Sequence, residues 1–252
     1  MKIQELTQYL DELLQVKRFK DYCPNGLQVS GKHKIKKIAF AVSATLDSIQ
    51  KSIKWEADAL ITHHGILWNY DGAQVISGPF KERIKLLLDH QINLISYHLP
   101  LDAHNELGNA AQLIKYFSAK NMVSFGDYKG CAVGMKAEFN KPLKLPLVLK
   151  KLETVLNHNI ICAEAKTSLI KSFAIVTGGG ASYYKEAYDQ GMDLFITGEM
   201  SEYHWHGAKE LGIHLVAGGH HATERGGVLA LAAHIQKKFH LQTQYFDSDN
   251  PI

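Results

Sequence analysis

The chain has 252 residues, of which 46% are hydrophobic and 21% are charged, values typical of a globular protein with a sizeable buried core. Its net charge of +3 comes from lysines and arginines scattered along the sequence, which argues against a nucleic-acid-binding protein. Three widely spaced cysteines indicate reduced thiols, and no apolar stretch approaches the ~18 residues of a membrane span, so we expect a cytoplasmic protein.

In the first half of the chain, helical and strand-like patterns alternate. Apolar residues at helical spacing predict an amphipathic first helix, which a turn at residues 21–26 then ends. The densest basic run, residues 32–37, is expected to be a solvated loop before a strand, with a nucleic-acid patch as the alternative. Further along, the pattern predicts strands at 38–43, 58–62 and 92–97, and helices at 46–55, 80–90 and 107–119. This alternation favours parallel strand pairing in an α/β layer architecture.

The second half of the chain repeats this plan. A shift of 135 positions places four residues on identical ones: Ala39, Asp58, Ile61 and Thr62 fall on Ala174, Asp193, Ile196 and Thr197. A shift of 122 positions places His98 on His220 and Asp102 on Glu224. These matches keep the order of strands and helices, which favours an ancient duplication. Residues 126–171, between the two copies, predict a small α/β insertion.

Two fragments share the pattern His-x-x-x-carboxylate, with His98 and Asp102 in one and His220 and Glu224 in the other. An adjacent pair, His63–His64, follows an apolar run. Imidazole and carboxylate are preferred ligands of Zn, Fe and Mn, and a mixed set of them does not select among these metals. Two ions held side by side activate water, which suits the hydrolysis of phosphate esters, amides or amidine-like ring bonds.

Each of these three patches follows a predicted strand, at residues 58–62, 92–97 or 213–218. In parallel α/β sheets, ligands bind beyond the carboxyl ends of the strands. We therefore expect an α/β fold of two similar halves, residues 1–125 and 126–252 of a single unit. The sheets should be mostly parallel, and a dinuclear metal site should lie in the cleft between the halves.

Structural roles remain open for several of these residues. His63 and His64 could be one core and one surface histidine, because adjacent side chains of a strand point to opposite faces. Asp102 could cap a helix, and Glu224 could interact with a helix dipole. His98 either binds a metal or orients Asp102 or a water from outside the ligand set.

Other polar and glycine-rich features are weaker candidates. Glu199 occupies the repeat position of His64 and is either an acid in the cleft or a structural residue. His104 is one such candidate, and His204 and His206 are two more, which lie two positions apart in a predicted helix, where their side chains would diverge. The run Gly178–Gly180 could bind an anion through backbone N–H groups at a helix start, or form a plain tight turn.

Four segments together carry a family resemblance: Asp21…Asn25-Gly26-Leu27-Gln28-Val29, Ile61-Thr62-His63-His64-Gly65, Tyr97-His98-Leu99-Pro100-Leu101-Asp102 and Gly219-His220-His221-Ala222-Thr223-Glu224-Arg225. They resemble the GTP cyclohydrolase 1 type 2 homolog family, also called the NIF-three-like proteins, in its short bacterial form. The resemblance implies two divalent metal ions (Fe, Zn or Mn) with five ligands: His63, His64, Asp102, His220 and Glu224, the last of them bridging. It also implies a toroidal homohexamer.

The function that this resemblance implies is that of a metal-dependent hydrolase acting on a purine nucleotide or a related heterocycle. Opening of the imidazole ring of GTP is its most specific form, with His98 or Glu199 transferring protons. Two alternatives require no turnover: a metal carrier or chaperone, and a regulatory ring scaffold. The sequence alone leaves these three functions open.

Overall fold

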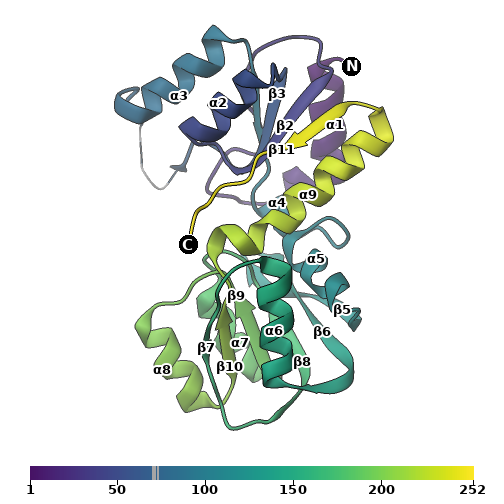
Figure 1. The fold of residues 1–252 in the computed structure, drawn as a ribbon, viewed down its shortest axis with the longest axis vertical. Coiled ribbons are helices and arrows are strands. Elements are labelled where there is room, and N and C mark those ends of the chain that lie inside the picture. Colours follow the sequence, from purple (N-terminus) through teal and green to yellow (C-terminus); the bar gives the residue numbers. More distant parts are fainter. Residues whose placement is uncertain (70–71, 73) are drawn as a thin grey trace. The chain divides into compact units, whose positions relative to one another are not determined.

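The computed structural model describes residues 1–69, 72 and 74–252, and Figure 1 shows its fold. The described residues form a mixed α/β protein with two β-sheets, which confirms the predicted fold class. They pack into two compact units, Met1–Leu101 with Val228–Asp249 (unit 1) and Asp102–Gly227 with Asn250–Ile252 (unit 2). The units are interleaved along the chain, so their boundaries are not those of the sequence halves. None of the described helices is long and apolar enough to cross a membrane.

The sheet of unit 1 has the strand order β1-β4-β3-β2-β11. Its strands are Gly26–Val29 (β1), Lys37–Ser43 (β2), Ala59–His64 (β3), Asn93–Ser96 (β4) and Gln242–Tyr245 (β11). Neighbouring strands pair in parallel, as predicted, except that β1 is antiparallel to β4. The helices of this unit include Ile3–Leu13 (α1), Leu46–Lys54 (α2) and Gly78–Asp89 (α3), and a short 3₁₀ helix covers Val16–Arg18 (η1).

The sheet of unit 2 has the strand order β5-β6-β8-β9-β10-β7. Its strands are Lys120–Tyr128 (β5), Cys131–Lys144 (β6), Ile161–Ala163 (β7), Leu169–Ile175 (β8), Leu194–Thr197 (β9) and His214–Ala217 (β10). The repeat strands β8, β9 and β10 are parallel, as predicted. The remaining pairs are antiparallel: β6 with β5, β6 with β8, and β7 with β10. For β5 and β6, the tight turn that joins them leaves no room for the crossover that parallel pairing needs.

Helices of unit 2 cover its sheet and complete its core. They are Asn109–Tyr116 (α5), Leu145–Leu156 (α6), Tyr184–Asp189 (α7) and Glu202–Leu211 (α8), with a 3₁₀ helix at Ala181–Tyr183 (η3). Two helices include the residues at which the units change: Leu99–Asp102 (α4) and His220–Phe239 (α9). Apolar residues of α6, such as Val148 and Leu152, are fully buried against Phe173 and its neighbours in the sheet. Burial of this apolar surface holds the helix on the sheet.

Strand registers support the proposed duplication. In unit 1, Ala39 of β2 is paired with Leu60 of β3, and in unit 2 Ala174 of β8 is paired with Phe195 of β9. Both members of the second pair lie 135 positions after those of the first, which is the shift found in the sequence. A register cannot slip by one residue without turning every side chain to the opposite face, so this agreement is specific.

Two aspartates make the same hydrogen bonds in the two units. Asp58 accepts the backbone N–H groups of Lys36 and Lys37 at 2.8 and 3.1 Å. Asp193, 135 positions later, accepts those of residues 171 and 172 at 2.7 and 3.0 Å. The identity of Asp58 and Asp193 in the sequence therefore reflects a shared structural role at the start of a repeat strand.

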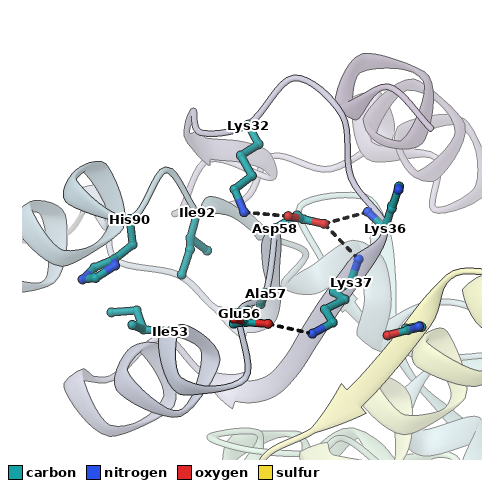
Figure 2. Close-up of a pocket in the computed structure, with 10 residues that line it drawn as sticks. Lys32, Lys36, Lys37, Ile53, Glu56, Ala57, Asp58, His90 and Ile92 are labelled. Atoms are coloured by element: carbon teal, nitrogen blue, oxygen red, sulfur yellow. Dashed lines mark hydrogen bonds and ion pairs between the residues drawn. The ribbon is translucent and has the colours of Figure 1, made fainter.

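The basic run at residues 32–37 lies beside a surface hollow of about 530 Å³ in unit 1. Lys32 Nζ lies 2.8 Å from Asp58 and Lys37 Nζ lies 3.3 Å from Glu56, and these ion pairs are drawn as dashed lines in Figure 2. These ion pairs tie the run to the turn before β3, and β2 begins at Lys37. The run is thus a loop that leads into a strand, as predicted.

Candidate functional site

Unit 1 brings together the three histidines that sequence analysis placed at strand ends. Thr62 of β3 is in register with Ser96 of β4, so the two strands end at the same edge of the sheet. His63 and His64 are the last residues of β3 rather than residues after it, and His98 follows β4. The ring centroids lie 4.7 Å apart for His63 and His64, and 5.0 Å apart for His63 and His98. One nitrogen from each ring lies within 4.8 Å of the others, which is close enough to share a metal.

Each of these imidazoles is held through Nδ1. In His63, Nδ1 lies 3.0 Å from the carbonyl oxygen of Tyr97. In His64 it lies 3.0 Å from Oγ of Ser43, and in His98 it lies 2.9 Å from Oδ1 of Asp21. A carbonyl oxygen can only accept, so Nδ1 of His63 carries the proton. In these orientations Nε2 is the ring nitrogen that can coordinate a metal, and an anchored Nδ1 is the usual arrangement around metal-binding histidines.

Asp21 is a buried carboxylate that sequence analysis left without a role. Besides His98, it accepts hydrogen bonds from the backbone N–H groups of Tyr22 and Leu99 and from the side chain of Asn25, at 2.7 to 3.0 Å. Burial opposes ionisation of Asp21, but its hydrogen bond to His98, the charge of His98 and the other donors hold its pKa below the ordinary value. The one signal in the sequence was its position in a family motif.

Gln28 holds the segment that follows His64. Its Oε1 accepts the backbone N–H of Ile66 at 2.9 Å, and its Nε2 donates to the carbonyl of Pro24 at 2.8 Å. A Cβ at Gly65 would collide with the amide of Gln28. A side chain at residue 65 would therefore displace the amide of Gln28 from these two hydrogen bonds.

Unit 2 places His220 and Glu224 on one face of α9, as their spacing of four residues predicts. Nε2 of His220 lies 3.3 Å from Oε1 of Glu224, whose side chain is only 4% exposed. Nδ1 of His220 lies 3.3 Å from Oε1 of Glu199, which follows β9 and is half-exposed. Burial lowers the pKa of His220, but the hydrogen bonds and negative charges of Glu224 and Glu199 outweigh it and raise the pKa to about 9.

Asp102 is buried at the end of α4. Its Oδ1 accepts hydrogen bonds from Asn109 Nδ2 at 2.7 Å and from Thr177 Oγ1 at 3.2 Å. The next helix, α5, has Gly108 as its N-cap and no side-chain cap, so Asp102 is not a helix cap. A carboxylate buried among neutral donors, without a role in the helix, is suited to binding a cation.

The run Gly178–Gly180 makes room for the carboxylate of Glu224. Gly178 has φ of +58°, and a Cβ at this position would collide with Oε1 of Glu224. Its carbonyl accepts a hydrogen bond from Thr197, and its N–H donates to Thr223. The run is therefore a tight turn that packs against the acidic site, and an anion would be repelled there.

The weaker histidine candidates have local structural roles. Nδ1 of His204 accepts the backbone N–H of Ser201 at the start of α8. His206 lies 2.9 Å from Glu202 on the exposed surface of the same helix. Nδ1 of His104 accepts the backbone N–H groups of Glu106 and Leu107. None of these three side chains belongs to a group of metal-ligand type within the described residues.

Comparisons with known proteins bear on the whole chain. The family model for Duf34/NIF3 (NGG1p interacting factor 3) matches residues 1–251. Proteins named GTP cyclohydrolase 1 type 2 homolog from Haemophilus influenzae and Pyrococcus abyssi are 42% and 40% identical over 248 and 249 residues, which is 98% of this chain and of each relative. The crystal structure of TTHA1606 from Thermus thermophilus is 31% identical, with a TM-score of 0.92 over 100% of both chains. Reduced HcgD from Methanocaldococcus jannaschii, 24% identical over 99% of this chain and 98% of its own, has a TM-score of 0.86 and therefore the same fold.

Proposed function

Because the chain belongs to the Duf34/NIF3 family, as its motifs predicted, we propose that it is a metal-dependent hydrolase that binds two divalent ions. The proposed ligands are the five residues that the resemblance implied: His63, His64, Asp102, His220 and Glu224. The observation that carries this proposal is the set of imidazoles in unit 1, each anchored through Nδ1 so that Nε2 is the nitrogen able to coordinate. Fixing an imidazole in one orientation costs side-chain conformational entropy, and that cost is expected where the ring must present one nitrogen to a metal.

The residues fit divalent metals in both units. Imidazole nitrogens and carboxylate oxygens together suit Zn, Fe and Mn, and the carboxylates of Asp102 and Glu224 would balance the charge of the ions. Glu224 and Glu199 already attract positive charge, since they raise the pKa of His220 to about 9. The buried position of Glu224 also agrees with its proposed role as the bridging ligand.

We take the substrate class from the names of the relatives, and propose a purine nucleotide such as GTP. Bound divalent ions would supply Lewis acidity and lower the pKa of a water towards neutrality. Addition of one water to the imidazole ring would open it to a formamide, and a second water would release the former C8 carbon as formate. His98 and Glu199 are the proposed proton-transfer residues, because His98 is fixed among the histidines and Glu199 is half-exposed beside His220.

The test is turnover by protein of known metal content. Protein loaded with Fe, Mn or Zn is incubated with GTP, and released formate is measured against metal occupancy. Wild type should release formate, the Glu224→Gln variant should not, and the matched surface variant Glu202→Gln should behave as wild type. Absence of turnover with every metal at full occupancy would remove the hydrolase from consideration.

A metal carrier is the second candidate function. One observation favours it: His220 is 31% exposed and its neighbour Glu199 51%, so this end of the proposed ligand set is open to exchange with solvent. A carrier would release metal to a chelator within minutes and show no turnover.

We also propose the homohexameric ring that the resemblance implied, which sedimentation equilibrium would test directly. A regulatory scaffold would keep that ring after loss of the metals.

A further inference from the structure

The loop Asp21–Asn25, which precedes β1, holds both the backbone and the ring of His98. Oδ1 of Asn25 accepts the backbone N–H of His98 at 2.8 Å, and Oδ2 of Asp21 accepts that of Leu99 at 3.0 Å. Oδ1 of Asp21 lies 2.9 Å from Nδ1 of the His98 ring. Asn25 in turn donates to Asp21 at 2.9 Å. These contacts fix the position of a histidine that is 77 residues away in the sequence.

Asp21 and His98 also form, with Cys23, a group whose atoms lie within 4.8 Å of one another and could hold a metal. The hydrogen bonds of Asp21 argue against that role. A carboxylate offers about four lone-pair sites, and Asp21 accepts from four donors: the N–H groups of Tyr22 and Leu99, the amide of Asn25 and the ring of His98. A metal would have to displace these bonds in a site that is 3% exposed. The carboxylate is saturated, and it acts through the donors that it holds.

The second half of the chain contains a looser version of the same contact. His220, the repeat counterpart of His98, has its Nδ1 3.3 Å from Glu199. Glu199 is half-exposed, whereas Asp21 is buried and fully bonded. A half-exposed carboxylate with one contact can move and exchange protons, but a buried one with four can only hold its partner. The two carboxylates therefore differ in role although each faces Nδ1 of a repeat-related histidine.

We propose that Asp21 is a positioning residue, which keeps the proton of His98 on Nδ1 so that Nε2 presents its lone pair beside His63 and His64. The role of the positioned nitrogen rests on the proposed function, in which His98 transfers a proton. The hydrogen bonds of Asp21, and the tautomer that they favour, are independent of that proposed function. Among the partners of Asp21, the Tyr22 and Leu99 amides are fixed donors, and Asn25 is held as a donor because its oxygen is used by His98 N–H. Only the ring of His98 can change from donor to acceptor.

This asymmetry gives a sharp test with Asp21→Asn. The introduced NH₂ group should take the place of Oδ1, where it loses only the hydrogen bond from Tyr22 N–H, because Oδ2 accepts from two donors, Asn25 and Leu99. There it faces His98, the one partner that can accept, and should move the His98 proton from Nδ1 to Nε2. The measurement is long-range ¹H–¹⁵N correlation NMR of the metal-free full-length protein labelled with ¹⁵N-histidine, with His98 identified through His98→Gln. The ratio of the two tautomers should change by about tenfold or more, since a charged acceptor binds N–H much more strongly than a neutral one. The matched control Asp58→Asn removes another acceptor of backbone N–H groups and should leave the ratio unchanged.

The wild-type spectrum alone tests whether the proton of His98 lies on Nδ1, even if the Asp21→Asn variant does not fold. A wild-type His98 protonated on Nε2 would overturn the proposal, as would a folded Asp21→Asn variant with the proton still on Nδ1. A second variant, Asn25→Ala, removes the hydrogen bond to the backbone N–H of His98 and should leave the His98 proton on Nδ1. If the tautomer ratio changed in this variant too, the change in Asp21→Asn would be due to a general loosening of the loop and not to the carboxylate. Titration of wild type with Zn²⁺ tests the proposed function separately: a protein that binds no metal would end that proposal and leave the tautomer result standing.

Discussion

Nε2 of His220 lies 3.3 Å from Oε1 of Glu224, one turn further along α9. Burial opposes the charged imidazolium, but this contact and the one with Glu199 raise the pKa of His220 from an ordinary 6.5 to about 9. In the metal-free protein the pair is therefore an ion pair near neutral pH. A bound metal would compete with this proton for the same nitrogen.

A pH dependence of stability follows for the metal-free protein. Because the folded-state pKa of His220 is raised, its stabilising contribution is fully present below about pH 6.5 and is lost as the pH rises through about 9. The midpoint of thermal unfolding of chelator-treated protein should fall across that window. The His220→Gln variant should lack this fall, and an unchanged slope in the variant would assign the effect to other groups.

Loss of Glu224 should weaken metal binding. We expect Glu224→Gln to lower Zn²⁺ affinity in isothermal titration by more than about tenfold, since even residues that only orient ligands affect affinity by about 10–100-fold. The matched control is Glu202→Gln, because Glu202 makes the same i,i+4 contact with His206 on the exposed face of α8. Equal losses in the two variants would show that the acid acts through net charge alone.

Ser43 should matter to the metal through His64. Its Oγ lies 3.0 Å from Nδ1 of that ring, so Ser43→Ala frees the ring to rotate. We expect metal affinity to fall by about 10–100-fold, whereas the free energy of unfolding should change by only about 1 kcal/mol. Ser52→Ala removes a different serine hydroxyl, which is buried and bonded to the carbonyl of Ser48 at 2.7 Å, and should leave the affinity unchanged. A similar affinity for both variants would contradict the anchoring role of Ser43.

The candidate ligands could be predicted from the sequence because local rules place them. An apolar run that ends in His63–His64 predicts a strand end, and parallel strands end at one edge of a sheet. A spacing of four residues predicts that His220 and Glu224 share a helix face, and they do. The repeat shift also indicated Glu199, which lies 3.3 Å from His220.

Long-range contacts could not be predicted in this way. Asp21 lies in an irregular loop, and nothing local indicates that its carboxylate meets a ring 77 residues later. The antiparallel pairing of β5 with β6 was also missed, because strand patterning shows which residues face the core and not the direction of a neighbour. Similarly, the glycines at 178–180 suggested a turn or an anion site, and only the position of Glu224 decided between them.

Gly178 provides a test of that decision. Alanine at this position meets two costs: φ of +58°, which disfavours any side chain, and a collision of Cβ with the carboxylate of Glu224. Gly191 has φ of +73°, and none of the described residues outside its immediate chain neighbours would come within 4 Å of a Cβ there, so alanine at this position meets only the first cost. Gly191→Ala should therefore lose about 1–2 kcal/mol in urea unfolding and keep its metal affinity. Gly178→Ala should lose more stability and also bind Zn²⁺ more weakly, because Glu224 must move. If both variants lost equal stability and retained full affinity, Gly178 would be a turn residue without influence on the acidic site.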